Sequence, residues 1–526
     1  MLLRFPSPMS GFVVALASVA GCGGEESFTL QLGNHEVVIE RVASARLAHT
    51  DQGLEHPIVV GDLDGDGIDD AVVRTTFMAA PSGDGNTVYG GAVYVLYGGS
   101  AVTGAIDLAQ LPAMVHVGSP SVSTPPSGGI AAVGDIDGDG LADFVVSIDG
   151  YIGCVDPPSP FIIDTAPVAG VWVVYGSATR LTGSHEIKDV AARLSEPPAC
   201  GRWNHAAGLG DIDGEGKADF AVSKQTSTLG EPYQVFVFYG RGERWSGTVD
   251  LASSADATIS EPGAANQLGA ASAYRVGDVD GDGFADFVVR LPLDASKLDA
   301  RIVRGSATRL AGAVGLPDIG HTRLPGGDFC FVSDLAYAVA LGDLDGDGAD
   351  DFSLVNCERS ADRLFALVRH RVFYGRTGGL PAQLEAVDAA ATLVPSHGFY
   401  PSQLIAGDVD GDGIPDLIFA DQNLHDTNGG VQVIKGQHER LSGAIDPSAE
   451  SKVSYIGQPQ PVPGCHGDNC TLPEKLGTGI SLGDLTGDHQ PDLIIGASSD
   501  DYEIIPVPGA AMGHTYVLSS PVMPKP

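Results

Sequence analysis

Basic side chains are scarce in this chain. Its 526 residues contain 29 Lys and Arg against 67 Asp and Glu, which gives a formal net charge of −38 at pH 7. So acidic a chain does not attract the phosphate backbone of nucleic acids. Beyond the N-terminal segment, no apolar run is long enough to cross a membrane as a helix. The composition therefore argues against a nucleic-acid-binding protein and a helical membrane protein.

Catalytic motifs are missing as well. The sequence has no H-E-x-x-H zinc motif, no P-loop and no dinucleotide fingerprint. Ser481 matches G-x-S-x-G, but it falls in a strand-like segment, whereas a nucleophile elbow needs a strand, a turn and a helix. Paired aspartates could mimic a glycosidase pair, but metal binding accounts for them. We therefore predict that the protein is not an enzyme.

The N-terminus has the pattern of an export signal. Arg4 precedes a short apolar region, residues 11–20, which ends in small residues directly before Cys22. This order is typical of a secretory signal, and a cysteine at that point resembles the bacterial lipobox. We predict a lipoprotein signal peptide at residues 1–21, lipidation of Cys22 and a tether at residues 22–40. An ordinary signal peptide with an incidental cysteine is the alternative. Either reading places the mature chain in the cell envelope or outside the cell.

What the chain does have is one acidic stretch in seven copies, which we number loop one to loop seven. In loop one, residues 62–70, carboxylates stand at positions 1, 3, 5 and 9, and Gly67 stands at position 6. Hard cations such as Ca²⁺ take about six to eight oxygen ligands, which alternating aspartates on a tight turn supply. The backbone carbonyl at position 7 is the natural further ligand. The copies start 65 to 76 residues apart, so we predict up to seven calcium sites.

Not all copies are equally complete. Glu215 is a longer but usable ligand in loop three, whereas loop seven has Thr486 at position 3 and His489 where glycine is expected. We therefore expect loop seven to be the weakest site. The predicted ligands at positions 1, 3, 5, 7 and 9 are, loop by loop, Asp62, Asp64, Asp66, Ile68, Asp70; Asp135, Asp137, Asp139, Leu141, Asp143; Asp211, Asp213, Glu215, Lys217, Asp219; Asp278, Asp280, Asp282, Phe284, Asp286; Asp343, Asp345, Asp347, Ala349, Asp351; Asp408, Asp410, Asp412, Ile414, Asp416; and Asp484, Thr486, Asp488, Gln490, Asp492.

An EF-hand is the first alternative for these loops. That loop needs a bidentate Glu at position 12 and a helix on each side. Position 12 is instead Val73 in loop one and Phe419 in loop six, within apolar runs typical of buried strands. Each loop therefore connects two strands.

Every repeat contains four short apolar segments, which predict four strands. In the first repeat, residues 57–61 precede the loop, residues 71–74 follow it, and residues 93–98 end in an aromatic-glycine step. Four short strands at a constant period are typical of propeller blades. The last repeat lacks its fourth segment, while residues 41–47 resemble the fourth segment at residues 189–194. We predict that this N-terminal strand pairs near Tyr516, completes the last blade and closes the ring.

The loop, the downstream V-x-V-x-Y-G strand and the period together resemble FG-GAP or VCBS repeats. These are the units of the integrin α-subunit propeller and of many bacterial secreted proteins. The resemblance covers about residues 41–520 and leaves residues 521–526 as a tail. It implies an all-β fold, a seven-bladed β-propeller of four-stranded antiparallel blades, with Ca²⁺ in the loop between the first two strands of each blade. The FG and GAP dipeptides are eroded, which weakens any expectation of integrin-like partners.

The face opposite these loops receives the longer connections. Six cysteines remain besides Cys22, an even number that suits disulfides, and blade connectivity pairs them as Cys154–Cys200, Cys330–Cys357 and Cys465–Cys470. Exposed aromatic residues on long ordered loops are good anchors for a partner. Candidate ligand-binding residues on that face are Tyr151, Phe161, Trp203, Phe329 and Phe331. The alternative is that these rings only cover loop cores.

The function that these features favour is a binding or adhesion module for a protein or glycan partner, held at the membrane by a lipid anchor only. Two other hypotheses remain: a polysaccharide hydrolase or lyase that uses the central funnel, and a structural surface lipoprotein. Turnover of polysaccharides would favour the enzyme, and saturable binding without turnover would favour the binding module.

Overall fold

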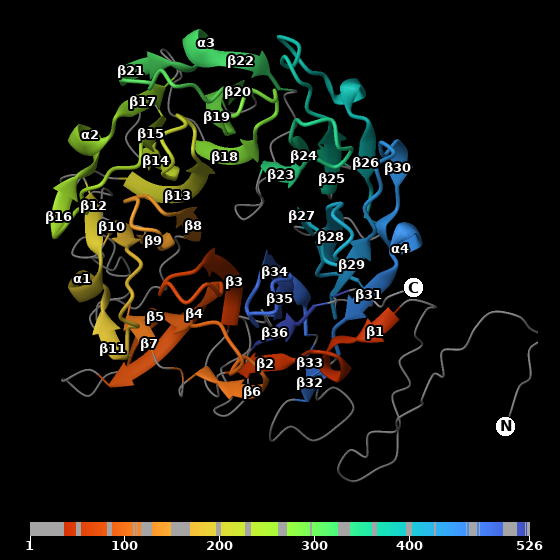
Figure 1. Cartoon of the computed structure of the whole chain (residues 1–526). Coiled ribbons are helices and arrows are strands. Elements are labelled where there is room, and N and C mark those ends of the chain that lie inside the picture. Colours follow the sequence, from red (N-terminus) through yellow and green to blue (C-terminus); the bar gives the residue numbers. More distant parts are fainter. Residues whose placement is uncertain are drawn as a thin grey trace, which may run out of the picture.

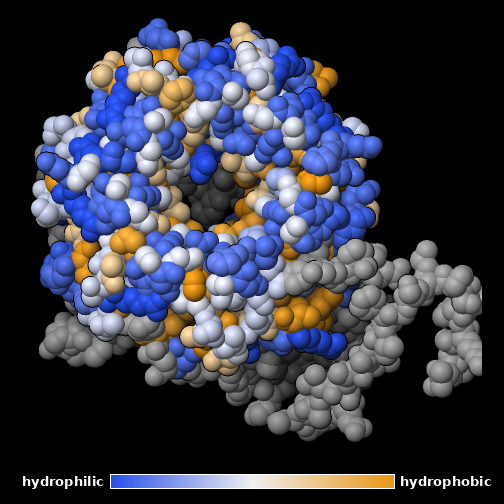
Figure 2. Space-filling model, viewed as in Figure 1, coloured by the Kyte–Doolittle hydropathy of each residue, from blue (hydrophilic) through white to orange (hydrophobic). Residues whose placement is uncertain are grey.

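Seven small sheets stand around a central axis and form a closed ring (Figure 1). The computed structural model describes residues 36–48, 54–81, 87–108, 111, 113–116, 129–148, 169–195, 201–226, 233–260, 271–294, 297–324, 337–359, 366–395, 402–424, 428–458, 460–461, 471–472, 474–497, 513–520 and 522. Figure 2 shows the blades surrounding a central hollow. The predicted all-β, seven-bladed propeller is confirmed. No described helix is both long and apolar enough to span a membrane.

Each blade is an antiparallel meander of four strands, and we number the blades by the loop that they contain. The first strands, nearest the axis, are β3 (Leu54–Gly61), β8 (Ile130–Gly134), β13 (Gly201–Gly210), β18 (Ser272–Gly277), β23 (Ala338–Gly342), β27 (Ser402–Gly407) and β34 (Leu476–Gly483). The second strands are β4 (Asp70–Pro81), β9 (Asp143–Ile148), β14 (Asp219–Thr226), β19 (Asp286–Asp294), β24 (Asp351–Arg359), β28 (Asp416–Asp421) and β35 (Asp492–Ala497). The third strands are β5 (Thr87–Leu96), β10 (Gly170–Val174), β15 (Gln234–Phe238), β20 (Lys297–Val303), β25 (Ala366–Phe373), β29 (Gly430–Ile434) and β36 (His514–Leu518). The fourth are β7 (Ala113–His116), β12 (Ala192–Ser195), β17 (Ala257–Ser260), β22 (Gly320–Arg323), β26 (Ala391–Leu393), β31 (Val453–Ile456) and, for blade seven, β2 (Ala45–Ala48).

The core lies between neighbouring blades. All six residues of β9 and all five of β10 are buried, because neighbouring blades cover both faces of the sheet. Strands that are covered on both faces have continuous apolar sequences. Between blades two and three, the rings of Phe220 and Phe238 stack 4.8 Å apart, and Trp245 packs edge-on against both. Full burial of a side chain such as Phe220 or Phe238 contributes about 1.5–3 kcal/mol to stability. The same side chains therefore hold each blade together and bind it to the next.

A fifth strand, which the sequence analysis did not predict, joins most blades to their neighbours. It lies in the connection between the third and fourth strands of one blade and pairs in parallel with the fourth strand of the preceding blade. These strands are β6 (Gly104–Asp107), β11 (Gly183–Glu186), β16 (Thr248–Asp250), β21 (Gly312–Gly315) and β30 (Gly443–Ile445). A single helical turn follows in several blades: α1 (Ile187–Val190), α2 (Leu251–Ser254), α3 (Leu316–Ile319), η3 (Ala386–Asp388) and α4 (Pro447–Glu450). A two-stranded ribbon, β32 (Gln460–Pro461) with β33 (Thr471–Leu472), lies before β34.

The N-terminal segment closes the ring. Strand β2 pairs antiparallel with β36, with Arg46 opposite Tyr516, as the sequence predicted. In Figure 1 this red strand lies beside the blue strands of the C-terminal blade. The segment also supplies β1 (Glu36–Val38), which pairs in parallel with β31 of blade six, and the turn η1 (Ile39–Arg41). Residues 36–40, expected to be part of a tether, are therefore part of the propeller.

Candidate metal-binding loops

The carboxylate at position 1 organises each aspartate loop. In loop one, Asp62 Oδ1 accepts the N–H of Gly65 at 2.6 Å, and Asp62 Oδ2 accepts the N–H of Gly67 at 2.8 Å. Both glycines have positive φ angles, 82° and 84°, a conformation that side chains with a Cβ rarely adopt. The spacing of aspartates and glycines therefore folds the loop around one carboxylate, and the same bonds recur in loop two at Asp135.

Position 9 ties the loop to the rest of its blade. Asp70 is fully buried; its Oδ2 accepts the N–H of Leu63 at 2.8 Å and its Oδ1 that of Gly98 at 2.7 Å. Burial raises the pKa of Asp70 to about 7, although these two hydrogen bonds oppose the shift. The equivalent residues of loops two to five have pKa values raised to about 7 by burial, and that of loop six to about 6: Asp143, Asp219, Asp286, Asp351 and Asp416. A bound cation would favour the ionised form of these groups.

The loops bring carboxylate oxygens to the spacing that a metal ion needs. In at least five loops, one oxygen from each of three carboxylates lies within 4.8 Å of the others. Ca²⁺–oxygen distances of about 2.3–2.6 Å place opposite ligands about 5 Å apart. In loop four, Asp280 Oδ1 is buried and has no hydrogen-bond partner, which leaves it available to a cation. The groups are Asp62, Asp64, Asp66; Asp135, Asp137, Asp143; Asp211, Asp213, Asp219; Asp278, Asp280, Asp282; and Asp343, Asp345, Asp347. The donor set fits a hard divalent cation.

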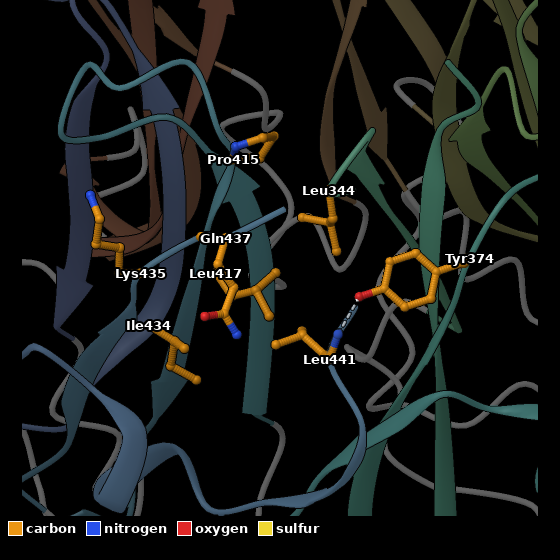
Figure 3. Close-up of a pocket in the computed structure, with 9 residues that line it drawn as sticks. Leu344, Tyr374, Pro415, Leu417, Ile434, Lys435, Gln437 and Leu441 are labelled. Carbon is orange, nitrogen blue, oxygen red and sulfur yellow. Dashed lines mark hydrogen bonds between the residues drawn. The ribbon is translucent and has the colours of Figure 1, made fainter. Parts of the chain in front are cut away.

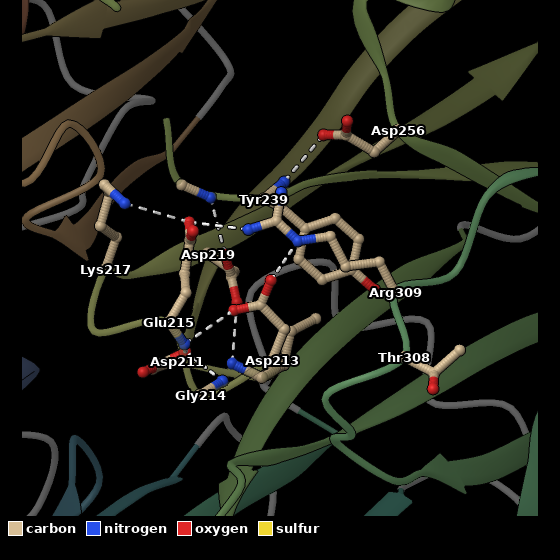
Figure 4. Close-up of polar contacts among 12 residues, drawn as sticks. Asp211, Asp213, Gly214, Glu215, Lys217, Asp219, Tyr239, Asp256, Thr308 and Arg309 are labelled. Atoms are coloured by element: carbon tan, nitrogen blue, oxygen red, sulfur yellow. Dashed lines mark hydrogen bonds and ion pairs between the residues drawn. The ribbon is translucent and has the colours of Figure 1, made fainter. Parts of the chain in front are cut away.

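In six loops a basic side chain contacts the carboxylate at position 3, and in five of these loops it also contacts the carboxylate at position 5. Figure 4 shows loop three, where Arg309 extends from the next blade over the Tyr239 ring to Asp213 and Glu215. Its Nη2 lies 2.8 Å from Glu215 Oε1. Burial alone would lower the pKa of Arg309, but these carboxylates raise it overall. The guanidinium therefore stays charged and neutralises part of the loop. The corresponding contacts are Arg180 in loop one, Arg244 in loop two, Arg304 in loop four, Arg440 in loop five and Lys435 in loop six.

Backbone hydrogen bonds link successive loops around the ring. In five seams, the N–H at position 8 donates to the carbonyl at position 1 of the preceding loop, as from Ala142 to Asp62 at 2.8 Å. Loops six and seven have Pro415 and Pro491 at position 8, which have no N–H to donate. At the seam between blades five and six a small cavity remains, bridged by the Leu441 N–H, which donates to Tyr374 Oη at 2.6 Å (Figure 3). The seams between blades five and six and between blades six and seven therefore lack this backbone link.

Loop seven keeps the backbone of the others but not their ligands. Asp484 accepts the N–H groups of Gly487 at 2.7 Å and His489 at 2.8 Å, as position 1 does elsewhere. His489 has φ of 64°, one of two described residues other than glycine with a positive value. Thr486 offers no carboxylate, and its buried hydroxyl has no hydrogen-bond partner among the described residues. That loop seven is the weakest metal site stays a prediction.

Several predicted residues lie outside the part of the chain that the structure describes. Cys357 lies in β24 and Trp203 in β13, opposite Lys224 in the register, but neither side chain is among those described. Ser481 lies in β34, and its hydroxyl accepts the N–H of Val59 from blade one at 3.1 Å. It therefore joins two blades, as its strand-like context suggested. The predicted residues outside the described ranges are Cys22, Tyr151, Cys154, Phe161, Cys200, Phe329, Cys330, Phe331, Cys465 and Cys470.

The basic residues at the loops were missed by sequence reasoning. Arg180 and Arg440, for example, each lie far along the chain from the loop that they contact. Arg180 and Asp64 are 116 residues apart. The signal that could have found them is the recurrence of an Arg followed by an apolar residue at the same point of several repeats, once neighbouring blades are placed side by side.

Ring and loops together define a seven-bladed propeller with carboxylate-lined loops. The chain is 30% identical over 230 residues to integrin alpha-V of Gallus gallus, a match that covers 41% of this chain and 19% of the integrin. The protein therefore forms an integrin α-like propeller, although it spans only about a fifth of the length of that relative. No protein-family model matches the chain.

Two solved structures also align with most of the chain. One is Pseudomonas fluorescens PhoX in complex with vanadate, at 10% identity and a TM-score of 0.32, covering 90% of this chain and 89% of that one. The other is the NanB sialidase of Streptococcus pneumoniae, at 10% identity and a TM-score of 0.33, covering 89% and 68%. At these scores neither likeness informs the function of this chain.

Proposed function

We propose that the protein is a calcium-stabilised binding module of the cell envelope or its exterior, without enzymatic activity. The observation that carries the proposal is the gathering of carboxylate oxygens within 4.8 Å in loop after loop of an integrin α-like propeller. Each of the first six loops would hold one ion through positions 1, 3, 5 and 9 and the position 7 carbonyl. The ligands are those predicted for these loops, from Asp62 to Asp416.

The donor set favours Ca²⁺ over other metals. All side-chain donors in these loops are carboxylate oxygens, which suit hard cations, and neither His nor Cys contributes. Ca²⁺ accepts the irregular coordination of a flexible loop, whereas Mg²⁺ demands a smaller, near-octahedral site. The ion would supply positive charge to the clustered carboxylates. The chain would orient the carboxylates at positions 1 and 9 through the hydrogen bonds that they accept from backbone N–H groups.

The binding partner is proposed to be a protein or a glycan. Support comes from the resemblance to an integrin α propeller and from the long connections that the sequence predicts on the face opposite the aspartate loops. Tyr151, Trp203 and Phe329 are proposed contact residues there. The export signal and Cys22 support a lipid-anchored surface location, and the six other cysteines support disulfides on that face.

The test is to count calcium ions on the purified chain. We expect about six ions per molecule, with Kd values of ~10⁻⁴–10⁻³ M typical of extracellular modules, and a lower melting temperature in chelator. Fewer than one ion per molecule at millimolar calcium would contradict the proposal. Binding to immobilised glycans and surface proteins, compared between the native chain and Trp203→Ala, tests the proposed partner face.

A further inference from the structure

Four loops receive an arginine from the next blade in one repeated arrangement. A tyrosine directly follows the third strand, and its hydroxyl accepts an N–H from the next blade, as from Leu181 to Tyr97 at 2.8 Å. The neighbouring Arg180 stacks on that ring, with Cζ 4.9 Å from its centroid, and contacts Asp64 and Asp66. The other three tyrosine–arginine pairs are Tyr175 with Arg244, Tyr239 with Arg309 and Tyr374 with Arg440.

Two further loops receive a basic group from their own blade instead. Arg304 and Lys435 occupy the place of the tyrosine at the end of the third strand. Arg304 Nε lies 3.0 Å from Asp280, and Lys435 Nζ contacts Asp410 and lies 2.8 Å from Asp412. At the place of the next-blade arginine for loop four stands Gly379, where a Cβ would collide with the Arg304 guanidinium. The basic group thus comes from either of two points in the chain but contacts the position 3 carboxylate in all six loops.

Loop seven shows what accompanies the loss of the basic group. Ser519 stands at the tyrosine position, Ala101 at the arginine position and Thr486 at position 3. The loop without a carboxylate at position 3 is therefore also the loop without an arginine or lysine at either place. The basic group is therefore present in the loops that have a position 3 carboxylate. Two blades can be joined without it, since backbone hydrogen bonds such as that from Gly99 to Leu485 at 2.9 Å still connect blades seven and one.

We propose that these six basic side chains are built-in competitors of calcium, which hold the carboxylates at positions 3 and 5 when the metal is absent. The inference rests on the proposed calcium sites. Without a metal, the basic group neutralises two carboxylates in five of these loops, and Arg304 neutralises Asp280 in loop four. Carboxylates so close together would otherwise repel each other. When calcium binds the same carboxylates, two cations share them and repel each other, which weakens metal binding.

The two sources of the basic group have different consequences for the ring. Arg180, Arg244, Arg309 and Arg440 cross from one blade to the next and keep the seam closed without metal. Arg304 and Lys435 stay within their own blades. Calcium exchange at loops one, two, three and five is therefore coupled to contact between blades, and exchange at loops four and six is not.

The experiment compares Arg244→Gln, Lys435→Gln and the control Arg241→Gln. The control substitution removes the same charge. Arg241 also stacks on an aromatic ring, with Cζ 4.4 Å from the centroid of Trp245, but it pairs with Asp256, outside any aspartate loop. Calcium affinity is measured by competition with a chromophoric chelator, and melting is measured in chelator. We expect one site about tenfold tighter in Arg244→Gln and in Lys435→Gln, since removing a competing positive charge favours the ion, and no change in Arg241→Gln. In chelator, Arg244→Gln should melt lower than Arg241→Gln.

Equal or weaker calcium binding in both Arg244→Gln and Lys435→Gln would overturn the inference, because the basic groups would then support the site and not compete for it. If Arg244→Gln does not fold, Lys435→Gln, which crosses no seam, decides the question. A native chain that binds no calcium refutes the proposed function itself and is distinguished from these results by the ion count alone.

Discussion

Loops one and seven share a backbone and differ in what they can bind. In both, the carboxylate at position 1 accepts the N–H groups of positions 4 and 6. In both, position 9 joins the loop to the end of the third strand, through Gly98 in loop one and Ser520 in loop seven. Yet loop seven has lost the position 3 carboxylate, the position 6 glycine and the basic side chain. The fold of the loop and its metal ligands are therefore separable.

The difference shows which residues do which task. Positions 1 and 9 fold the loop, because their hydrogen bonds survive where the position 3 carboxylate does not. Positions 3 and 5 have fewer backbone partners, and they contact the basic side chains, as Asp64 and Asp66 contact Arg180. Blade seven, which holds the incomplete loop, is also the blade assembled from both ends of the chain. That blade also holds a buried network just before β34: Tyr516 Oη donates to Glu474, and Glu474 accepts the N–H of Gln458 at 2.6 Å.

The largest expected effect comes from removing the segment that completes blade seven. A chain that begins at residue 50 loses β2 from blade seven and β1 from blade six, which exposes two strand edges. We expect it to aggregate or fail to fold, judged by circular dichroism and size-exclusion chromatography. The matched control begins at residue 36 and keeps both strands. If the shorter chain melts at the temperature of the control, the pairing of β2 with β36 is not what closes the ring.

The second-largest expected effect is a pH dependence of the melting temperature, caused by the position 9 carboxyls that both loops share. The folded state holds protons on Asp70, Asp143 and Asp219 up to about pH 7, whereas unfolded aspartates release theirs near pH 4. Between these values the folded state binds more protons than the unfolded chain, so a rise in pH destabilises the folded state. In chelator, melting should fall by more than about 5 °C from pH 5.5 to pH 8.

Calcium should reverse that trend by stabilising the ionised carboxylates. The rise in melting temperature on adding calcium is therefore expected to grow from pH 5.5 to pH 8. The effect is measured by calorimetry at matched ionic strength, with magnesium as the control ion. A calcium increment that shrinks over this range would show that the position 9 carboxyls do not control metal binding.

Much of this arrangement was readable from the sequence because it repeats. The aspartate spacing predicted the loops, and the likeness of residues 41–47 to residues 189–194 predicted closure by β2. The fifth strands were missed because a segment such as Gly183–Glu186 has no buried residue and no apolar alternation. The basic side chains were missed because Arg180 and Asp64 come together only when two blades stand side by side. The local sequence pattern is enough to predict a blade, whereas contacts between blades can be predicted only once the blades are arranged in the ring.

A smaller effect is expected when one position 3 or position 5 carboxylate is removed. Asp280→Asn in loop four should lose one bound ion, whereas Asp488→Asn in loop seven should lose none. Asparagine keeps a side-chain oxygen that can accept backbone N–H groups. At 10 mM calcium the lost ion contributes about 1.4–2.7 kcal/mol, or roughly 1–3 °C in a chain of this length. Equal losses of calcium in both variants would erase the distinction between the loops.

The smallest effect should come from giving loop seven the glycine of loop one. His489 has a φ of 64°, a left-handed conformation that costs a residue with a Cβ about 1–2 kcal/mol and glycine almost nothing. Glycine also gains freedom in the unfolded chain, so His489→Gly should stabilise the protein by only about 0.5–1 kcal/mol. The matched variant Gly413→His, at position 6 of loop six with a φ of 86°, should destabilise it by at least as much. Calorimetry in chelator isolates the backbone term from the metal. A lower melting temperature for His489→Gly would mean that the imidazole, 3.7 Å from Asp484, stabilises loop seven by more than its backbone conformation costs.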